Sequence, residues 1–145
     1  MLNLPKFNQV AFAFATLLQA DPAPGAGFAI ITPGNQIISP ITLYFTYIAS
    51  AAVANRLPGF VINTGASTFY AFTALNPITA ALTFSVVAST CPNYLFNPAP
   101  GFIISLPFPR DIFLYNPDLF NVGALNMDAA DQITNISLHH KFWPI

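Results

Sequence analysis

The sequence has very few ionised side chains. Only 6% of its 145 residues are charged, against roughly 25% in an ordinary soluble domain. Glutamate is absent, and no charged residue occurs between Arg56 and Arg110. Because an isolated monomer needs a hydrated surface, we expect much of the exterior to be covered by other subunits, a partner or lipid. The hydrophobic fraction of 54% excludes intrinsic disorder.

Basic clusters and paired cysteines are absent as well. The net charge is −1 and no run of Lys or Arg occurs, so binding to a nucleic-acid backbone is not supported. The single cysteine, Cys91, excludes an intrachain disulfide. It has no activating cation or histidine nearby in the sequence, so we expect a small buried hydrophobe rather than a reactive thiol.

Motifs for catalysis and metal binding are also missing. The sequence has no HExxH, CxxC, G-x-S-x-G or glycine-rich phosphate loop. His139 and His140 would point to opposite faces of a strand, so we interpret them as surface or interface histidines. Metal ligands shared between subunits are the alternative. We therefore expect a protein that is not an enzyme and that has no metal and no cofactor.

A membrane-spanning helix is not predicted either. The longest apolar candidates, 41–54 and 78–91, have 14 residues each, whereas a spanning helix needs about 20. Both are rich in Thr and in β-branched or aromatic residues, which favour strands. The N-terminal apolar run loosely imitates a signal peptide, but Pro5 lies upstream of it, so we treat residues 1–27 as mature structure.

The residues that are present alternate with a period of two. In the stretch 28–63, Leu43, Phe45 and Tyr47 alternate with Thr42, Tyr44 and Thr46, as successive side chains of a β-strand do. Neither set is strongly polar, so we expect packing on both faces of this strand. Further strands are predicted at 67–74, 79–90, 102–106, 111–115, 120–126 and 132–142, separated by Pro, Gly and Asn turn signals.

These strands predict an all-β protein, an antiparallel β-sandwich or jelly roll of eight or nine short strands. Residues 7–20 are compatible with a strand, an extended arm or a helix, and we favour the first two. We therefore divide the chain into an N-terminal arm or strand at 1–27 and a single sandwich domain at 28–145. In the last strand, Thr134, Ile136 and Leu138 are expected on one face, and the face with Asn135 and His139 is expected to be wet.

Arg56 is the exception in a long uncharged region. A buried lone cation is costly, so it is expected to be paired. One alternative is a structural Arg that binds backbone carbonyls or an Asp, and the other is a pair between subunits. The bend Met127–Asp131 (MDAAD) predicts Asp side chains that accept hydrogen bonds from backbone N–H groups. Arg110 and Asp111 are expected to pair locally or with a neighbouring subunit.

Two stretches carry a family resemblance. The first is ITPGNQIISPITLYFTYIASAAVANRLPGFVI, and the second is ISLPFPRDIFLYNPDLFNVGALNMDAADQITNISLHHKFW. Together they cover roughly residues 28–143, and they resemble small virion proteins of tailed bacteriophages. The first has a Pro-Gly turn, a long alternating strand, a small-residue bend and an Asn-Arg pair. The second has an Asn-Pro turn where that pattern has Pro-Gly, and the first 25 residues lie outside the resemblance.

The resemblance implies a non-enzymatic capsid decoration or cement protein with a jelly-roll-like fold. Such a protein is a homo-oligomer, usually a trimer, seated on the major capsid protein at the exterior of a virion assembled in the host cytoplasm. No nucleic acid and no membrane would be bound. The alternatives are another virion component (a shell subunit, head fibre, or tail or adaptor protein), a sugar-binding jelly roll that uses Trp143 and Asn135, and a membrane-associated β protein.

Subunit contacts are expected from irregular segments and exposed aromatic residues. We favour the N-terminal arm up to Gly27 and the proline-rich loop at 91–100. The candidate interface residues are Phe12, Phe14, Arg56, Tyr94, Phe96, Arg110 and Trp143.

Overall fold

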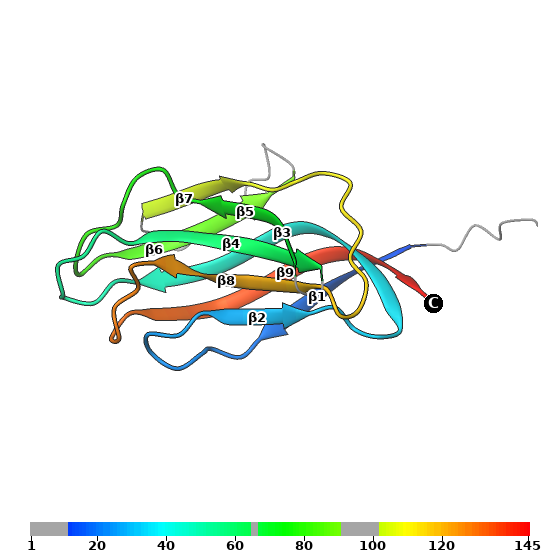
Figure 1. Cartoon of the computed structure of the whole chain (residues 1–145), viewed down its shortest axis with the longest axis horizontal. Coiled ribbons are helices and arrows are strands. Elements are labelled where there is room, and N and C mark those ends of the chain that lie inside the picture. Colours follow the sequence, from blue (N-terminus) through cyan, green and yellow to red (C-terminus); the bar gives the residue numbers. More distant parts are fainter. Residues whose placement is uncertain (1–11, 65–66, 91–101) are drawn as a thin grey trace, which may run out of the picture.

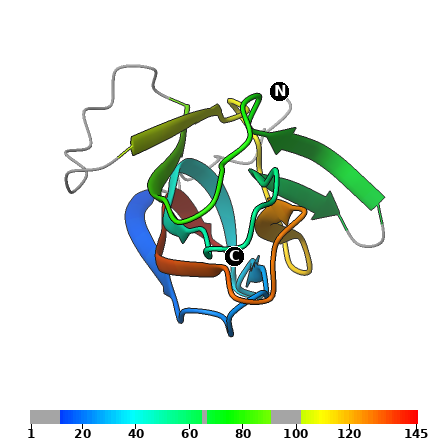
Figure 2. The same ribbon diagram turned by 90° about the vertical axis from the view of Figure 1, so that its left-hand side faces the viewer.

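The computed structural model describes residues 12–64, 67–90 and 102–145. Over these residues the protein is an all-β sandwich of two sheets, as Figures 1 and 2 show from two directions. The prediction of an all-β sandwich is therefore confirmed. The candidate residues Tyr94 and Phe96, together with Cys91, lie outside the described residues, as do 1–11 of the expected N-terminal arm.

The larger sheet has five strands in the order β1-β9-β3-β6-β7. Their bounds are β1 Ala13–Gln19, β9 Gln132–Pro144, β3 Gln36–Ile48, β6 Thr83–Ser89 and β7 Phe102–Pro107. The smaller sheet has the order β2-β8-β4-β5. Its bounds are β2 Phe28–Ile31, β8 Leu119–Leu125, β4 Leu57–Thr64 and β5 Ser67–Thr73. Neighbouring strands are antiparallel except β6 and β7, which are parallel.

The strands pair in nested order. β1 pairs with β9, β2 with β8, β3 with β6, and β4 with β5, so the first half of the chain meets the second half in reverse. β7 alone stands outside this scheme, at the edge of the larger sheet beside β6. Most neighbouring strands therefore come from distant parts of the sequence, the exceptions being β4–β5 and β6–β7, and connections such as those from β1 to β2 and from β2 to β3 cross between the two sheets.

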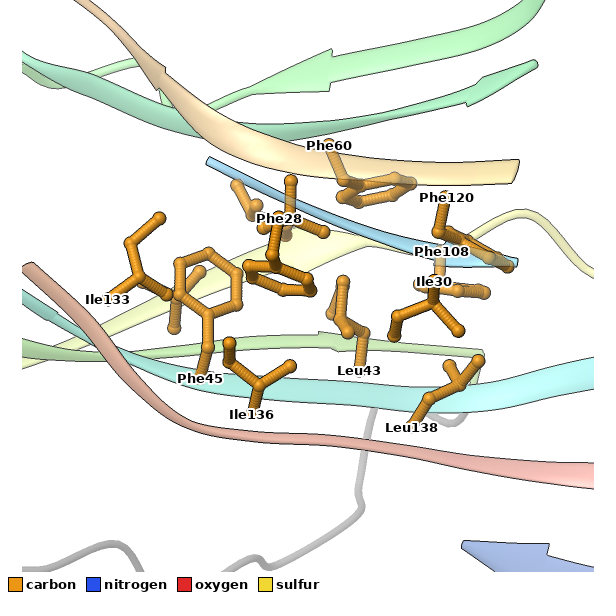
Figure 3. Close-up of a cluster of buried hydrophobic side chains, with 14 of the residues drawn as sticks. Phe28, Ile30, Leu43, Phe45, Phe60, Phe108, Phe120, Ile133, Ile136 and Leu138 are labelled. Atoms are coloured by element: carbon orange, nitrogen blue, oxygen red, sulfur yellow. The ribbon is translucent and has the colours of Figure 1, made fainter. Parts of the chain in front are cut away.

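The core lies between the two sheets (Figure 3). Leu43 and Phe45 from β3 face Phe28 and Phe60 from the smaller sheet, and all four are buried. The ring centroids of Phe28 and Phe45 are 6.0 Å apart, edge to face, an arrangement favourable for aromatic pairs. The alternation in β3 therefore predicts the inward face correctly from Leu43 onward.

The outward face of β3 differs from our expectation of packing on both faces. Thr42 is buried, but Tyr44, Thr46 and Ile48 remain partly exposed on the outside of the larger sheet. Hydroxyl groups give this face its polar contacts: the Thr42 and Ser89 side-chain oxygens lie 3.2 Å apart on neighbouring strands. The threonines explain why the pattern is neither clearly polar nor clearly apolar.

The predicted strand at 111–115 does not form. Only Leu114 makes a β-bridge, an isolated one with Ile38. Asp111 has a φ of 58°, which lies in the left-handed region and interrupts extended structure. Because Pro107 and Pro109 also lack backbone donors, the chain crosses between β7 and β8 as a loop that is tied down at Leu114.

Positive φ values explain two further differences from the expected strands, one in where a strand begins and one in which residues face the core. β6 begins at Thr83 rather than at 79, because residues 80–81 form a turn in which Ala81 has a φ of 57°. In β9, Asn135 has a φ of 55° at a register shift opposite β3, which is the geometry of a β-bulge. The bulge puts Ile133 into the core, so our assignment of Thr134 to the inner face is wrong.

Candidate interaction surface

The two ends of β9 carry the two chemically distinctive sites of the described chain. Asp131 directly precedes this strand, and Trp143 lies at its far end. At about 3.3 Å per residue the two ends are roughly 40 Å apart. In Figure 1 the turns that lead into β4 and β9 lie at the left, whereas the C-terminus lies at the right.

An ion pair between Arg56 and Asp131 organises the first end. The Arg56 Nε donates to Asp131 Oδ2 at 2.6 Å, and both side chains are 0% exposed. The rest of the guanidinium donates to Ser50 Oγ at 2.9 Å and to the Ala52 carbonyl at 3.0 Å. A buried charge is tolerable only when such hydrogen bonds replace its lost water.

Asp131 accepts further hydrogen bonds from three elements. Tyr47 of β3 donates its hydroxyl to Oδ2 at 2.6 Å. The backbone N–H of Ser50 donates to Oδ1, and that of Asp128 donates to Oδ2, each at 2.8 Å. The expectation that the Asp side chains of the 127–131 bend accept backbone N–H groups is confirmed, since Asp128 Oδ1 also accepts from Ala130.

These contacts fix the ionisation states of the cluster. Burial by itself opposes ionisation of Asp131, but hydrogen bonds from Arg56, Tyr47 and backbone N–H groups outweigh it and hold its pKa well below the usual range. Burial, reinforced by the hydrogen bond to the Asp131 carboxylate, raises the pKa of Tyr47. Asp131 is thus an ionised acceptor and Tyr47 a neutral donor at neutral pH.

The cluster is a structural clamp within one chain. Arg56 is a bridge residue opposite Ile78, and the Asp131 carbonyl accepts from the backbone N–H of Gly25. The network therefore joins the β3–β4 turn, the β8–β9 turn and the segment between β1 and β2. Of the two alternatives for Arg56, the structure shows the structural one. Because Arg56 is fully buried, we remove it from the candidate interface residues.

Aromatic side chains gather at the other end of β9. Phe12 lies next to Phe14 and Trp143, with ring centroids 5.5 Å and 5.8 Å away. The Phe113 ring is 5.5 Å from Trp143, and the Lys141 ammonium lies 5.3 Å from the centroid of Phe12, within the range of a cation–π contact. We call these five residues the aromatic cluster.

The aromatic cluster is largely open to solvent. Phe12 and Phe113 are half-exposed, and Phe14 is 67% exposed. Leu18, which projects from the same face of β1 as Phe14, is 80% exposed. Large apolar side chains scattered singly over a surface are normal, but a contiguous group along one edge is typical of an interaction site.

The structure brings together three of the candidate residues and separates others. Phe12, Phe14 and Trp143 meet in the aromatic cluster. Arg110 is exposed in the β7–β8 loop and donates from Nε to the Thr90 carbonyl at 3.2 Å. Trp143 and Asn135, the pair considered for sugar binding, lie eight residues apart on β9, roughly 26 Å along the strand, so they do not form one site.

Two members of the aromatic cluster were missed from the sequence. Phe113 was assigned to a strand that does not form, and the loop conformation carries it to Trp143. Lys141 was assigned to the wet face of the last strand, without a partner. Its register opposite Phe14, two residues from Phe12, would have placed Lys141 near the Phe12 ring, but the pairing of β1 with β9 could not be read from the sequence.

Neither a metal site, nor a membrane-spanning helix, nor a related protein points to a function for the described chain. Among the described residues, no three His, Cys, Asp or Glu side chains gather as a metal site, and none of the described segments forms a helix that could span a bilayer. Comparison with protein-family models, with curated proteins and with solved structures yields no match.

Proposed function

We propose that the chain is a structural subunit of a virion, a capsid decoration protein that associates with copies of itself on a head shell and stabilises it. The observation that carries the proposal is the aromatic cluster together with the β1 edge. This surface is apolar and exposed, and Lys141 is its one charged member. Surfaces of this composition are stabilised by contact with a partner rather than with water.

The nested strand pairing supports the same proposal. Pairs β1·β9, β2·β8, β3·β6 and β4·β5 are those of a long hairpin rolled into two sheets, and we infer a jelly roll with β7 as an added edge strand. Jelly rolls recur in viral capsid proteins and in lectins. This support is an analogy of fold. Between the capsid proteins and the lectins, we favour the capsid proteins because of the sequence resemblance described above.

The mechanism we propose is mass action by many weak contacts. A subunit that binds the assembled shell but not its dissociated parts shifts the equilibrium toward the shell. Repetition of the same apolar contact by symmetry then multiplies its effect. The low charge of the chain serves this role, because few ionised groups have to be desolvated when the surface is covered.

The proposal is tested by sedimentation with head shells of the virus that encodes the chain. We expect saturable co-sedimentation with assembled shells, a higher unfolding temperature of the decorated shell, and no binding to unassembled capsid subunits. A chain that stays in the supernatant, or that binds unassembled subunits equally well, contradicts it. Imaging the native particle separates the alternatives, because a head fibre, tail or adaptor protein would be found at another position.

A further inference from the structure

The described sandwich has four edge strands, and they are not equally protected. β2 has only four residues, β7 ends at Pro107, and β5 pairs with β4 through a register shift at Ile62/Asn63. Short strands, prolines and bulges all hinder the addition of another strand. β1 has none of these features. Its seven residues, AFATLLQ, contain no charge, proline or glycine, and pair with β9 without a register shift.

β1 also carries two exposed large apolar side chains, Phe14 at 67% and Leu18 at 80%, whereas among the described side chains β2 and β7 each carry one that is less exposed, Ile31 and Ile103. Among the described residues β1 is hydrogen-bonded to β9 only, and Phe14 and Leu18 project from the outer face of the sheet. In β5, the exposed residues whose side chains the structure describes are Ser67, Thr68, Ala71 and Thr73, none of which is a large apolar residue. β1 and β5 lie on different sides of the molecule in both views (Figures 1 and 2).

The sequence of β1 is complementary to itself when reversed. In an antiparallel pair of two copies centred on Thr16, Phe14 of each copy faces Leu18 of the other, and the two Thr16 residues face each other. Ala15 and Leu17 meet in the same way toward the inner face. Aromatic–aliphatic and Thr–Thr neighbours are favourable cross-strand pairs. The register also places the two exposed large apolar side chains of the strand, Phe14 and Leu18, against one another.

We propose that two copies of this chain associate through the free edges of β1, antiparallel and centred on Thr16. The larger sheets of the two copies then join into one continuous sheet across a two-fold axis, which is the isologous geometry of most homodimers. We name a second copy as the partner because an antiparallel copy of β1 places Leu18 opposite Phe14 and Phe14 opposite Leu18, so both exposed side chains gain an apolar neighbour. This inference deepens the proposed function by naming one subunit contact, but it is tested without shells.

The first test is the mass of the full chain in solution over a range of concentrations, by sedimentation equilibrium. We expect dimers or even-numbered assemblies. Leu18→Lys should weaken association by about tenfold or more, since a charged residue blocks edge pairing and each interface contains two copies of it. Leu75→Lys is the matched control, because Leu75 is 96% exposed outside any strand, and it should associate like the original chain.

The second test fixes the register by cross-linking in a Cys91→Ser background. Facing residues of an antiparallel pair have Cα atoms about 4.5–5.5 Å apart, within the range of a disulfide. Thr16→Cys should therefore cross-link to itself on mild oxidation. Leu18→Cys should not, because two copies of residue 18 would be separated by four residues, about 13 Å.

Four outcomes would overturn the inference. A monomer at all concentrations shows that β1 does not pair. A trimer, which the family resemblance implies, has an odd number of copies and cannot be built from two-fold β1 pairs alone. Equal association of Leu18→Lys and Leu75→Lys places the contact elsewhere. Cross-linking at residue 18 but not at 16 refutes the register. None of these results depends on shell binding, so the proposed function stands or falls separately.

Discussion

The two ends of β9 reverse the usual distribution of polar and apolar groups. At Asp131 a full ion pair is removed from water, whereas at Trp143 aromatic rings are left in it. The chain has four Lys or Arg and five Asp residues, and one of each sign is fully buried in the clamp. A protein already poor in charge thus has fewer charges on its surface than its composition indicates. The first end secures the fold of the single chain, and the second is available for association.

The largest loss of stability is expected when the ion pair between Arg56 and Asp131 is broken. Asp131→Asn keeps the shape of the side chain but leaves the Arg56 guanidinium buried without its counter-charge. Breaking a buried pair in this way costs about 3–5 kcal/mol, and we expect a loss of that size in the free energy of unfolding, measured by urea denaturation. Asp111→Asn is the matched control, since Asp111 is exposed, and it should change stability by less than about 0.5 kcal/mol. Similar values for both variants would contradict the clamp.

Low pH should weaken the same Arg56–Asp131 ion pair in the original chain, without a mutation. The pKa of Asp131 is lowered in the folded chain, so the unfolded chain binds a proton more readily, and folding stability falls as pH decreases below the ordinary Asp value of about 3.9. The stabilisation is fully present above that value and is lost progressively toward the lower folded pKa. Urea midpoints measured from pH 6 to pH 2 should show this decline, and Asp131→Asn should flatten it. An unchanged slope in the variant would assign the acid sensitivity to other groups.

A smaller effect is expected from the tyrosine of the clamp. Tyr47→Phe removes a 2.6 Å hydrogen bond to an ionised carboxylate and leaves the ring in place, so the loss should be about 1.5–3 kcal/mol in the free energy of unfolding. Tyr115→Phe is the control, because Tyr115 is half-exposed. A Tyr47→Phe variant as stable as the control would show that Arg56 and the backbone N–H groups of Ser50 and Asp128 satisfy Asp131 without the tyrosine hydroxyl.

Features set by neighbouring residues could be predicted from the sequence, whereas features that depend on distant segments meeting could not. The inward alternation of Leu43 and Phe45 is set by local strand geometry, and the need of Arg56 for a partner follows from the cost of a bare buried charge. The identity of that partner depends on two turns meeting, 75 residues apart in the sequence. The strand at 111–115 and the inner face at Thr134 were mispredicted because Asp111 and Asn135 adopt positive φ values, which the alternation of neighbouring residues does not reveal.

The smallest effect is expected at the aromatic end of β9, where a substitution should hardly change the free energy of unfolding of an isolated chain. Phe14→Ala removes a ring that is 67% exposed, so we expect a change below about 0.5 kcal/mol at low protein concentration, against about 3–5 kcal/mol for truncating a buried Phe such as Phe45. The effect should emerge only when copies associate. Apparent stability of the original chain should rise with protein concentration by mass action, and that rise should be reduced in Phe14→Ala but retained in Leu75→Ala. A large loss at low concentration would instead show that the aromatic cluster stabilises the single chain.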